Sequence, residues 1–231
     1  MGASEEMFEA VKAGDVTKLN ELLESSPALF NTRTEAGVSV LQMATYHGRR
    51  EIVNFLIARG AQMSLFEAAA VGHQERVTAL LNEQPGLINS QAADGFTALG
   101  LAAFFGHRQV VDLLLTHGAD VNIPSQNAMA VAPLHSAVAR QQVTIAAVLL
   151  AKGAEVNARQ AGGITPLHQA VQSGQLEMVK LLLHYGADPR AQADDGRTPL
   201  AMAVDAGNLS VADLLRQLAS SVKTQSAVGP A

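Results

Sequence analysis

The residues of this chain best suited to acid–base or metal chemistry are its seven histidines, because the chain contains no cysteine. They are His47, His73, His107, His117, His135, His168 and His184. Without Cys, disulfides, thiolate metal ligands and Cys nucleophiles are excluded. A zinc site on a helix needs paired histidines at a spacing such as H-E-x-x-H, and no such pair occurs. The pattern predicts no metal site and no catalytic histidine.

A set of acidic residues recurs in similar sequence contexts and could suggest acid–base catalysis. Asp120, Glu155 and Asp188 each follow a Gly-Ala pair. General acid–base pairs need closely placed groups in contrasting environments, whereas this spacing favours solvated turn residues in successive structural units. Gly-rich phosphate loops and the G-x-S-x-G motif are also missing. We expect no catalytic residue, no cofactor and no enzyme activity.

The elements that carry these residues repeat along the chain. The sequence TPLHQA at 165–170 returns as TPLAMA at 198–203, a period of 33 residues. Looser copies begin at Ala132 (APLHSA), Thr97 (TALGLA) and Ser39 (SVLQMA). Each is followed by a second apolar helical pattern that ends at Gly-Ala. Such a fixed period indicates stacked helix–turn–helix units, each of which buries its apolar face against its neighbours.

The period and the T-P-L-H phrase resemble the ankyrin-repeat family. The resemblance implies an all-α fold: an ankyrin-repeat solenoid of helix-turn-helix units with short β-hairpin loops. It also implies that His135 and His168 bind backbone groups of adjoining hairpins. We count about seven repeats, at 4–36, 37–64, 65–94, 95–128, 129–162, 163–195 and 196–220.

The predicted domain covers residues 1–220, with polar capping repeats first and last, and a disordered tail over 221–231. Residues 7–63 also align without gaps on 65–121, which pairs Pro27 with Pro85. The third repeat begins too soon after the second helix before it to hold a hairpin. We therefore expect a missing hairpin there, which opens the groove for a protruding partner element.

Composition restricts the class of partner. The net charge is −5 and basic residues are scattered, so nucleic acid is not expected. We find no signal peptide and no apolar run long enough for a membrane helix, and expect a cytoplasmic monomer that does not bind membranes.

By the same resemblance, a partner contacts the concave face, made of hairpin tips and first helices. Aromatic residues dominate binding hot spots, and this chain has only seven Phe and two Tyr. Several of them occupy partner-facing positions, although one of the two adjacent phenylalanines could instead turn inward. The candidate partner-binding residues are Tyr46, His47, Phe96, Phe104, Phe105, Met129, Val131 and Arg140.

The leading hypothesis is a non-catalytic protein–protein interaction scaffold or adaptor. Two alternatives stay open: a dedicated regulatory or inhibitory subunit of an enzyme, and a self-associating structural protein. Because a shared scaffold serves many partners, the sequence does not identify the partner.

Overall fold

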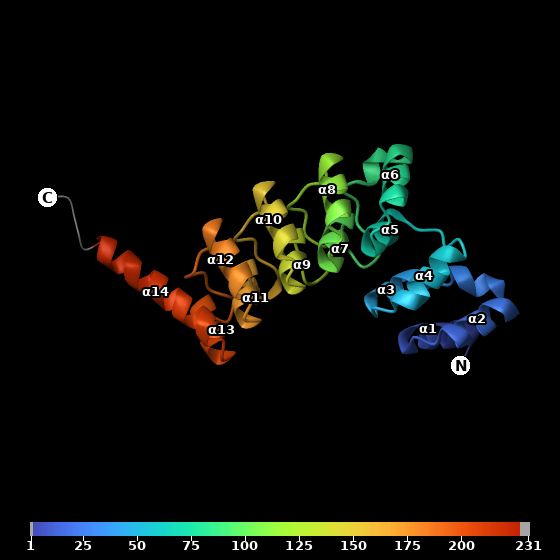
Figure 1. Cartoon of the computed structure of the whole chain (residues 1–231), viewed down its shortest axis with the longest axis horizontal. Helices are drawn as coiled ribbons and strands as arrows, with labels where there is room; N and C mark the ends of the chain where they lie inside the picture. The colour runs from blue at the N-terminus through green and yellow to red at the C-terminus, as the bar shows by residue number, and fades with distance from the viewer. Residues whose placement is uncertain (1, 227–231) are drawn as a thin grey trace. The chain divides into compact units, whose positions relative to one another are not determined.

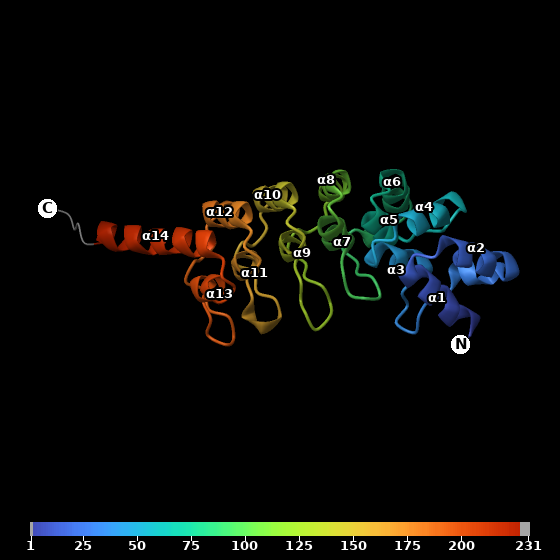
Figure 2. The ribbon, with the colours of Figure 1, turned by 60° about the horizontal axis from the view of Figure 1, so that its bottom comes forward.

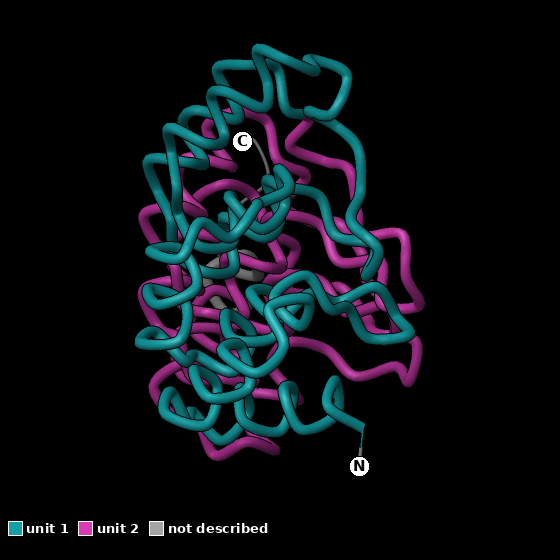
Figure 3. Tube along the Cα trace, turned by 90° about the vertical axis from the view of Figure 1, so that its right-hand side faces the viewer, with its two compact units in different colours: residues 1–119 teal, residues 120–231 magenta. Residues whose placement is uncertain are grey.

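The structure is a computed structural model that describes residues 2–226 of the 231-residue chain. The described residues form fourteen α-helices, which follow one another in seven pairs (Figure 1). The chain divides into two compact units, Met1–Ala119 and Asp120–Ala231, coloured separately in Figure 3. Each unit is described by itself below.

Unit 1 contains four helix pairs. These are α1 (Ala3–Ala13), α2 (Val16–Ser25), α3 (Val40–Tyr46), α4 (Arg50–Ala58), α5 (Leu65–Val71), α6 (Gln74–Glu83), α7 (Ala98–Phe105) and α8 (Arg108–Thr116). The first helices of the pairs pack in the order α1, α3, α5, α7. Two 3₁₀ segments, η1 (Pro27–Asn31) and η2 (Pro85–Leu87), follow α2 and α6, so the prolines that the internal alignment pairs begin equivalent turns.

Unit 2 contains three helix pairs. These are α9 (Pro133–Ala139), α10 (Val143–Ala151), α11 (Pro166–Gln172), α12 (Leu176–His184), α13 (Pro199–Asp205) and α14 (Leu209–Ser226), with one 3₁₀ segment, η3 (Ala161–Gly163). The helices α9, α11 and α13 stack in sequence. Figure 2 shows the loops that precede them side by side on one side of this unit.

The T-P-L phrase and its looser copies fold as the start of a first helix. Thr165 is the N-cap of α11 and its side chain accepts a hydrogen bond from the His168 amide, while Pro166 occupies the first turn. Thr198 and Thr97 cap α13 and α7 in the same way. Proline fits there because the N–H it lacks has no intrahelical acceptor.

Small apolar residues let these short helices approach closely. Ala68, Ala102 and Ala103 have no exposed surface in α5 and α7, and Ala137 and Ala170 are equally buried in α9 and α11. Leucines and valines of the second helices fill the space behind them. The packing is thus achieved with few aromatic side chains, since interiors are filled to crystal-like density by whatever shapes fit.

Hairpin loops connect most of the repeats, and in the described part of the chain they contain isolated β-bridges instead of strands. The bridges are Arg33–Ser39 and Gln91–Thr97 in unit 1 and Gln160–Ile164 in unit 2. The third repeat differs: residues 59–64 alone connect α4 to α5, whereas residues 84–97 connect α6 to α7.

The C-terminal helix is longer than the sequence pattern suggested. We placed a disordered tail over 221–231, yet α14 continues to Ser226. No glycine or proline interrupts the chain between Leu209 and Ser226, so the helix has no stop signal before Gly229. Residues 227–231 lie outside the described residues, and disorder of the tail stays a prediction.

Candidate functional site

Four aromatic side chains of unit 1 lie together; we call Tyr46, Phe96, Phe104 and Phe105 the aromatic patch. Tyr46 ends α3, Phe104 and Phe105 end α7, and Phe96 precedes α7. The Tyr46 and Phe105 rings stack with centroids 5.8 Å apart and planes 9° apart. The Phe104 and Phe105 rings meet edge to face at 5.1 Å. The patch therefore joins repeats two and four, although α5 of repeat three packs between their first helices.

The patch is hollowed and open to solvent. Tyr46, Phe96, Leu101 and Phe104 line an apolar hollow of about 250 Å³. Tyr46 is 40% exposed, and both phenylalanines of α7 are half-buried, so neither turns fully into the core. An apolar side chain of a partner that entered this hollow would lose water contact on several sides, which is the arrangement found at binding hot spots.

A polar network fixes the Tyr46 ring. The Tyr46 hydroxyl donates a hydrogen bond to Asp94 and accepts one of 3.0 Å from the Gln42 side-chain amide. That amide nitrogen also donates to the Asp94 carboxylate at 2.9 Å. Burial, together with the hydrogen bond to Asp94, raises the pKa of the Tyr46 phenol, so the hydroxyl keeps its proton at neutral pH.

The missing hairpin of repeat three does not open the groove, and this expectation was wrong. The hairpins of repeats two and four come into contact where the third would have stood. A Cβ added at Gly37, whose φ is +79°, would lie 3.2 Å from the Ala93 Cβ. Asp94 of the same hairpin reaches back to Gln42 and Tyr46 of α3. A hairpin omitted from a stack leaves a gap, and its neighbours close it because voids are costly in packed proteins.

Sequence reasoning missed Glu67, a buried carboxylate in repeat three. Ser64-Leu65-Phe66-Glu67 stands where repeat six has Thr165-Pro166-Leu167-His168, so Glu67 takes the histidine position. Its side chain accepts hydrogen bonds from the Ser64 amide at 2.8 Å and the Ser64 hydroxyl at 2.7 Å. The Ser39 hydroxyl of repeat two is a further donor. The serine-to-glutamate spacing of a capping box was the available signal.

The remaining four candidate residues are described within their own units. His47 is the C-cap of α3 and is exposed. Met129, Val131 and Arg140 belong to unit 2. Met129 is 55% exposed in the loop before α9, Val131 is half-buried, and Arg140 is the exposed C-cap of α9. The structure therefore groups four of the eight candidate residues.

The histidines of the T-P-L-H phrases are fully buried structural residues. The His135 Nε2 atom lies 3.1 Å from the Ile164 carbonyl, and the His168 Nε2 atom lies 3.2 Å from the Arg197 carbonyl. In both cases the acceptor belongs to the next hairpin. Burial lowers the pKa of both imidazoles, to about 4 for His135. Each neutral ring therefore donates a hydrogen bond that joins two repeats.

Among the residues that the structure describes, no three His, Asp, Glu or Cys side chains are grouped as metal ligands would be. The same part of the chain contains no helix that combines the length and apolar character of a membrane span.

Comparison with known families agrees with the fold. A family model described as "Ankyrin repeats (3 copies)" matches residues 65–160 and 134–226. These matches cover well over half of the chain, which therefore belongs to the ankyrin-repeat family. Ankyrin repeats are protein–protein interaction modules, so the family places the chain among proteins that act by binding other proteins.

Several curated proteins are similar to parts of this chain. Target of rapamycin complex 2 subunit AVO2 of Saccharomyces cerevisiae is 29% identical over 63% of this chain and 36% of its own length. Putative ankyrin repeat protein FPV014 of Fowlpox virus is 28% identical over 67% of this chain and 37% of its own length. E3 ubiquitin-protein ligase XBAT33 of Arabidopsis thaliana is 32% identical over 49% of this chain and 24% of its own length. The matched region is well under half of each of these relatives.

Proposed function

We propose that this chain is a non-catalytic scaffold or adaptor that holds a protein partner at the aromatic patch of unit 1. The observation that carries the proposal is the contact between Tyr46 of repeat two and Phe105 of repeat four beside an open apolar hollow. Isolated exposed aromatics are common, but a cluster of them around a hollow is typical of an interaction surface.

The network beneath the patch supports this reading. Asp94 and Gln42 hold the Tyr46 hydroxyl, so the ring is already oriented before a partner arrives. A preorganised aromatic side chain loses little conformational entropy on binding, which favours affinity. Packing alone would not require an exposed tyrosine at this position, whereas an adaptor that recognises a partner side chain would benefit from one.

The similarity to a named subunit of a larger complex is consistent with a binding role for this chain. The alternative of a dedicated regulatory or inhibitory subunit of an enzyme uses the same surface and differs in having one cognate partner. Affinity capture with quantitative mass spectrometry separates the two, because an adaptor retains several proteins and a dedicated subunit retains one in equal amount. A cytoplasmic location is part of the proposal, and fractionation of cells that express the chain tests it.

The test of the patch is a pair of alanine variants measured against the captured partner. Phe104→Ala and Tyr46→Ala should each weaken binding by about 2 kcal/mol, roughly thirtyfold, as truncation of a central aromatic anchor does. Tyr185→Ala is the matched control, since Tyr185 is 39% exposed but lies in unit 2. Circular dichroism first establishes that all three variants keep their helical content.

The proposal fails if both patch variants bind normally while the Tyr185 variant loses affinity. In that case the aromatic patch serves packing, and the binding surface is in unit 2.

A further inference from the structure

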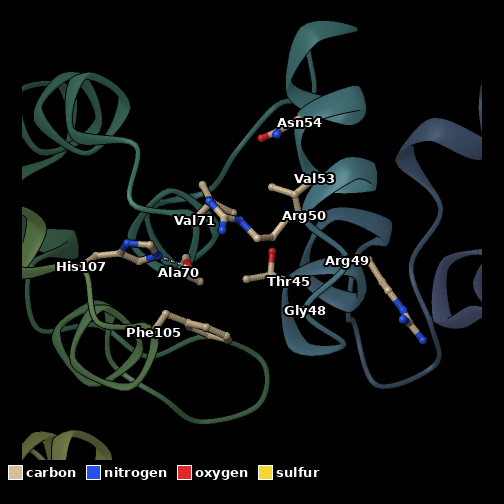
Figure 4. Close-up of a pocket in the computed structure, with 10 residues that line it drawn as sticks. All are labelled: Thr45, Gly48, Arg49, Arg50, Val53, Asn54, Ala70, Val71, Phe105 and His107. Carbon is tan, nitrogen blue, oxygen red and sulfur yellow. Dashed lines mark hydrogen bonds between the residues drawn. The ribbon is translucent and has the colours of Figure 1, made fainter. Parts of the chain in front are cut away.

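A second hollow of unit 1 shares Phe105 with the aromatic patch and differs from it in chemistry. It has a volume of about 460 Å³ and lies between α4 and the C-terminal ends of α5 and α7 (Figure 4). We call it the arginine cleft, after Arg49 and Arg50. Its apolar wall is formed by Val53, Val71 and Phe105.

The cleft follows from the short connection in repeat three. Residues 59–64 bring α5 directly after α4, and α5 packs tightly on α7. The second helices diverge instead: α2 packs on α4 and α6 packs on α8, while α4 and α6 are not among the packed pairs. Elsewhere in the unit, neighbouring second helices pack against each other. Between α4 and α6 this packing is missing, which leaves space for the cleft.

The charge of the cleft is positive. Its lining residues include Arg49 and Arg50 and no Asp or Glu. The Arg49 guanidinium donates to the Lys12 carbonyl and extends away from the other lining residues in Figure 4, so Arg50 is the cation that faces the cleft. Glu51 does not line the cleft, although it shares a neighbouring hollow with Arg49 and Arg50.

Arg50 is the least explained residue of the cleft. No hydrogen bond or ion pair joins its guanidinium to any residue that the structure describes. Figure 4 shows its side chain extended across the cleft toward Ala70 and Val71. It also begins α4, where the helix dipole disfavours a cation and favours a carboxylate. Arg50 is exposed, so its guanidinium is accessible to an anionic group that a ligand brings to the cleft.

We propose that the arginine cleft binds an acidic peptide segment of a protein partner, with one apolar side chain against Val53, Val71 and Phe105 and a neighbouring carboxylate on Arg50. The guanidinium can bind a carboxylate with two parallel hydrogen bonds. The cleft volume of about 460 Å³ falls in the range of pockets that bury a small ligand. This site is separate from the aromatic patch, and only the Phe105 ring borders both.

The probe for the test is a fluorescein-labelled peptide with a single leucine flanked by four glutamates on each side, titrated with the full chain by fluorescence anisotropy. Binding is expected at 50 mM salt and should weaken as salt is raised, because the attraction is screened. Arg50→Glu should weaken binding at least tenfold. The same peptide with serine in place of leucine should also bind more weakly.

Lys152→Glu is the matched control, because Lys152 is an exposed cation of unit 2 whose reversal changes the net charge equally. It should bind the peptide as the parent chain does. Arg50→Glu places a carboxylate in the first turn of α4, so it is expected to fold, and circular dichroism confirms this before titration.

Three results would overturn the inference: no binding of the leucine peptide by the parent chain, equal losses in the Arg50 and Lys152 variants, or tighter binding of a single-stranded oligonucleotide than of the peptide. None of these results would contradict the proposed role of the aromatic patch, because that role is tested with other variants and with the captured partner.

Discussion

At the scale of single residues, the two T-P-L-H histidines show how one neighbour changes a buried imidazole. Both ring nitrogens of His168 have a hydrogen-bond partner. The Nδ1 atom lies 2.8 Å from the Thr165 hydroxyl, and the Nε2 atom bonds to the Arg197 carbonyl. Repeat five has Ala132 in place of threonine, so the His135 Nδ1 atom is buried without a partner. Protonation of that nitrogen would place an unsolvated charge in the core, which agrees with the low pKa of about 4.

This burial predicts that acid weakens the fold. The pKa of His135 is about 4 when folded and 6.5 when exposed, so the unfolded chain binds more protons between these values. The stability contributed by the neutral ring is complete above pH 6.5 and is lost as pH falls toward 4. Between pH 7.5 and pH 5 the loss from this residue should be ~2 kcal/mol. Urea unfolding at the two pH values measures it.

The control is His135→Gln, which removes the titrating group and should unfold with a shallower pH dependence than the parent chain. His107 and His168, whose pKa values burial also lowers, contribute in the same direction. Equal stability at both pH values, or higher stability at pH 5, would contradict the assignment.

The roles of these histidines could be predicted from the sequence, because the Pro-Leu-His phrase places the imidazole at the same position in repeats five and six. The contact between Tyr46 and Asp94 could not be. It joins residues of repeats two and four, and no local pattern shows that the hairpin between them is replaced by contact of its neighbours.

At the scale of elements, α9 is an incompletely capped helix. Ala132 supplies no side-chain hydrogen bond at its N-terminus, whereas Thr165 caps α11 at the equivalent position. The helices have the same length and the same Pro-Leu-His start. They therefore provide a natural comparison of a capped and an uncapped repeat.

Ala132→Thr is expected to stabilise the chain by about 0.5–2 kcal/mol, the range of an N-cap side chain. The new hydroxyl can accept from the His135 amide, and it also offers a partner to the unsatisfied His135 Nδ1 atom. Thr165→Ala is the mirror control and should lose a similar amount. Urea unfolding at pH 7.5 measures both, and a loss in Ala132→Thr with no change in Thr165→Ala would refute the capping argument.

The helices and their order followed from the 33-residue period, but their relative packing did not. The sequence showed that residues 59–64 leave no room for a hairpin, and the structure agrees that the connection is short. What it did not show is the consequence. The hairpins on either side meet on one face, and α4 and α6 diverge on the other, where the arginine cleft forms. Both outcomes depend on packing between distant segments, which periodicity does not encode.

At the scale of the whole molecule, the alternative of self-association predicts a different distribution of exposed apolar residues. The large apolar side chains exposed in the described residues are Tyr46, Met129, Tyr185, Val204 and Leu209. They are spread over both units; Tyr46 belongs to the aromatic patch, and the Tyr185 ring meets only the His184 ring beside it among the described residues. Stable homodimers usually bury a larger and more continuous apolar area than scattered residues provide.

We therefore expect the chain to be a monomer. Sedimentation equilibrium over a hundredfold range of concentration should give a constant mass equal to that of one 24.2 kDa chain. The thermal midpoint should likewise not depend on concentration, since an obligate dimer gains stability by mass action and a monomer does not. A mass that rises with concentration would favour the structural, self-associating class. Phe104→Ala then locates the contact: if it restores the monomer, the aromatic patch binds a second copy of this chain, and if it does not, the exposed pair Val204 and Leu209 of the last repeat is the next surface to change.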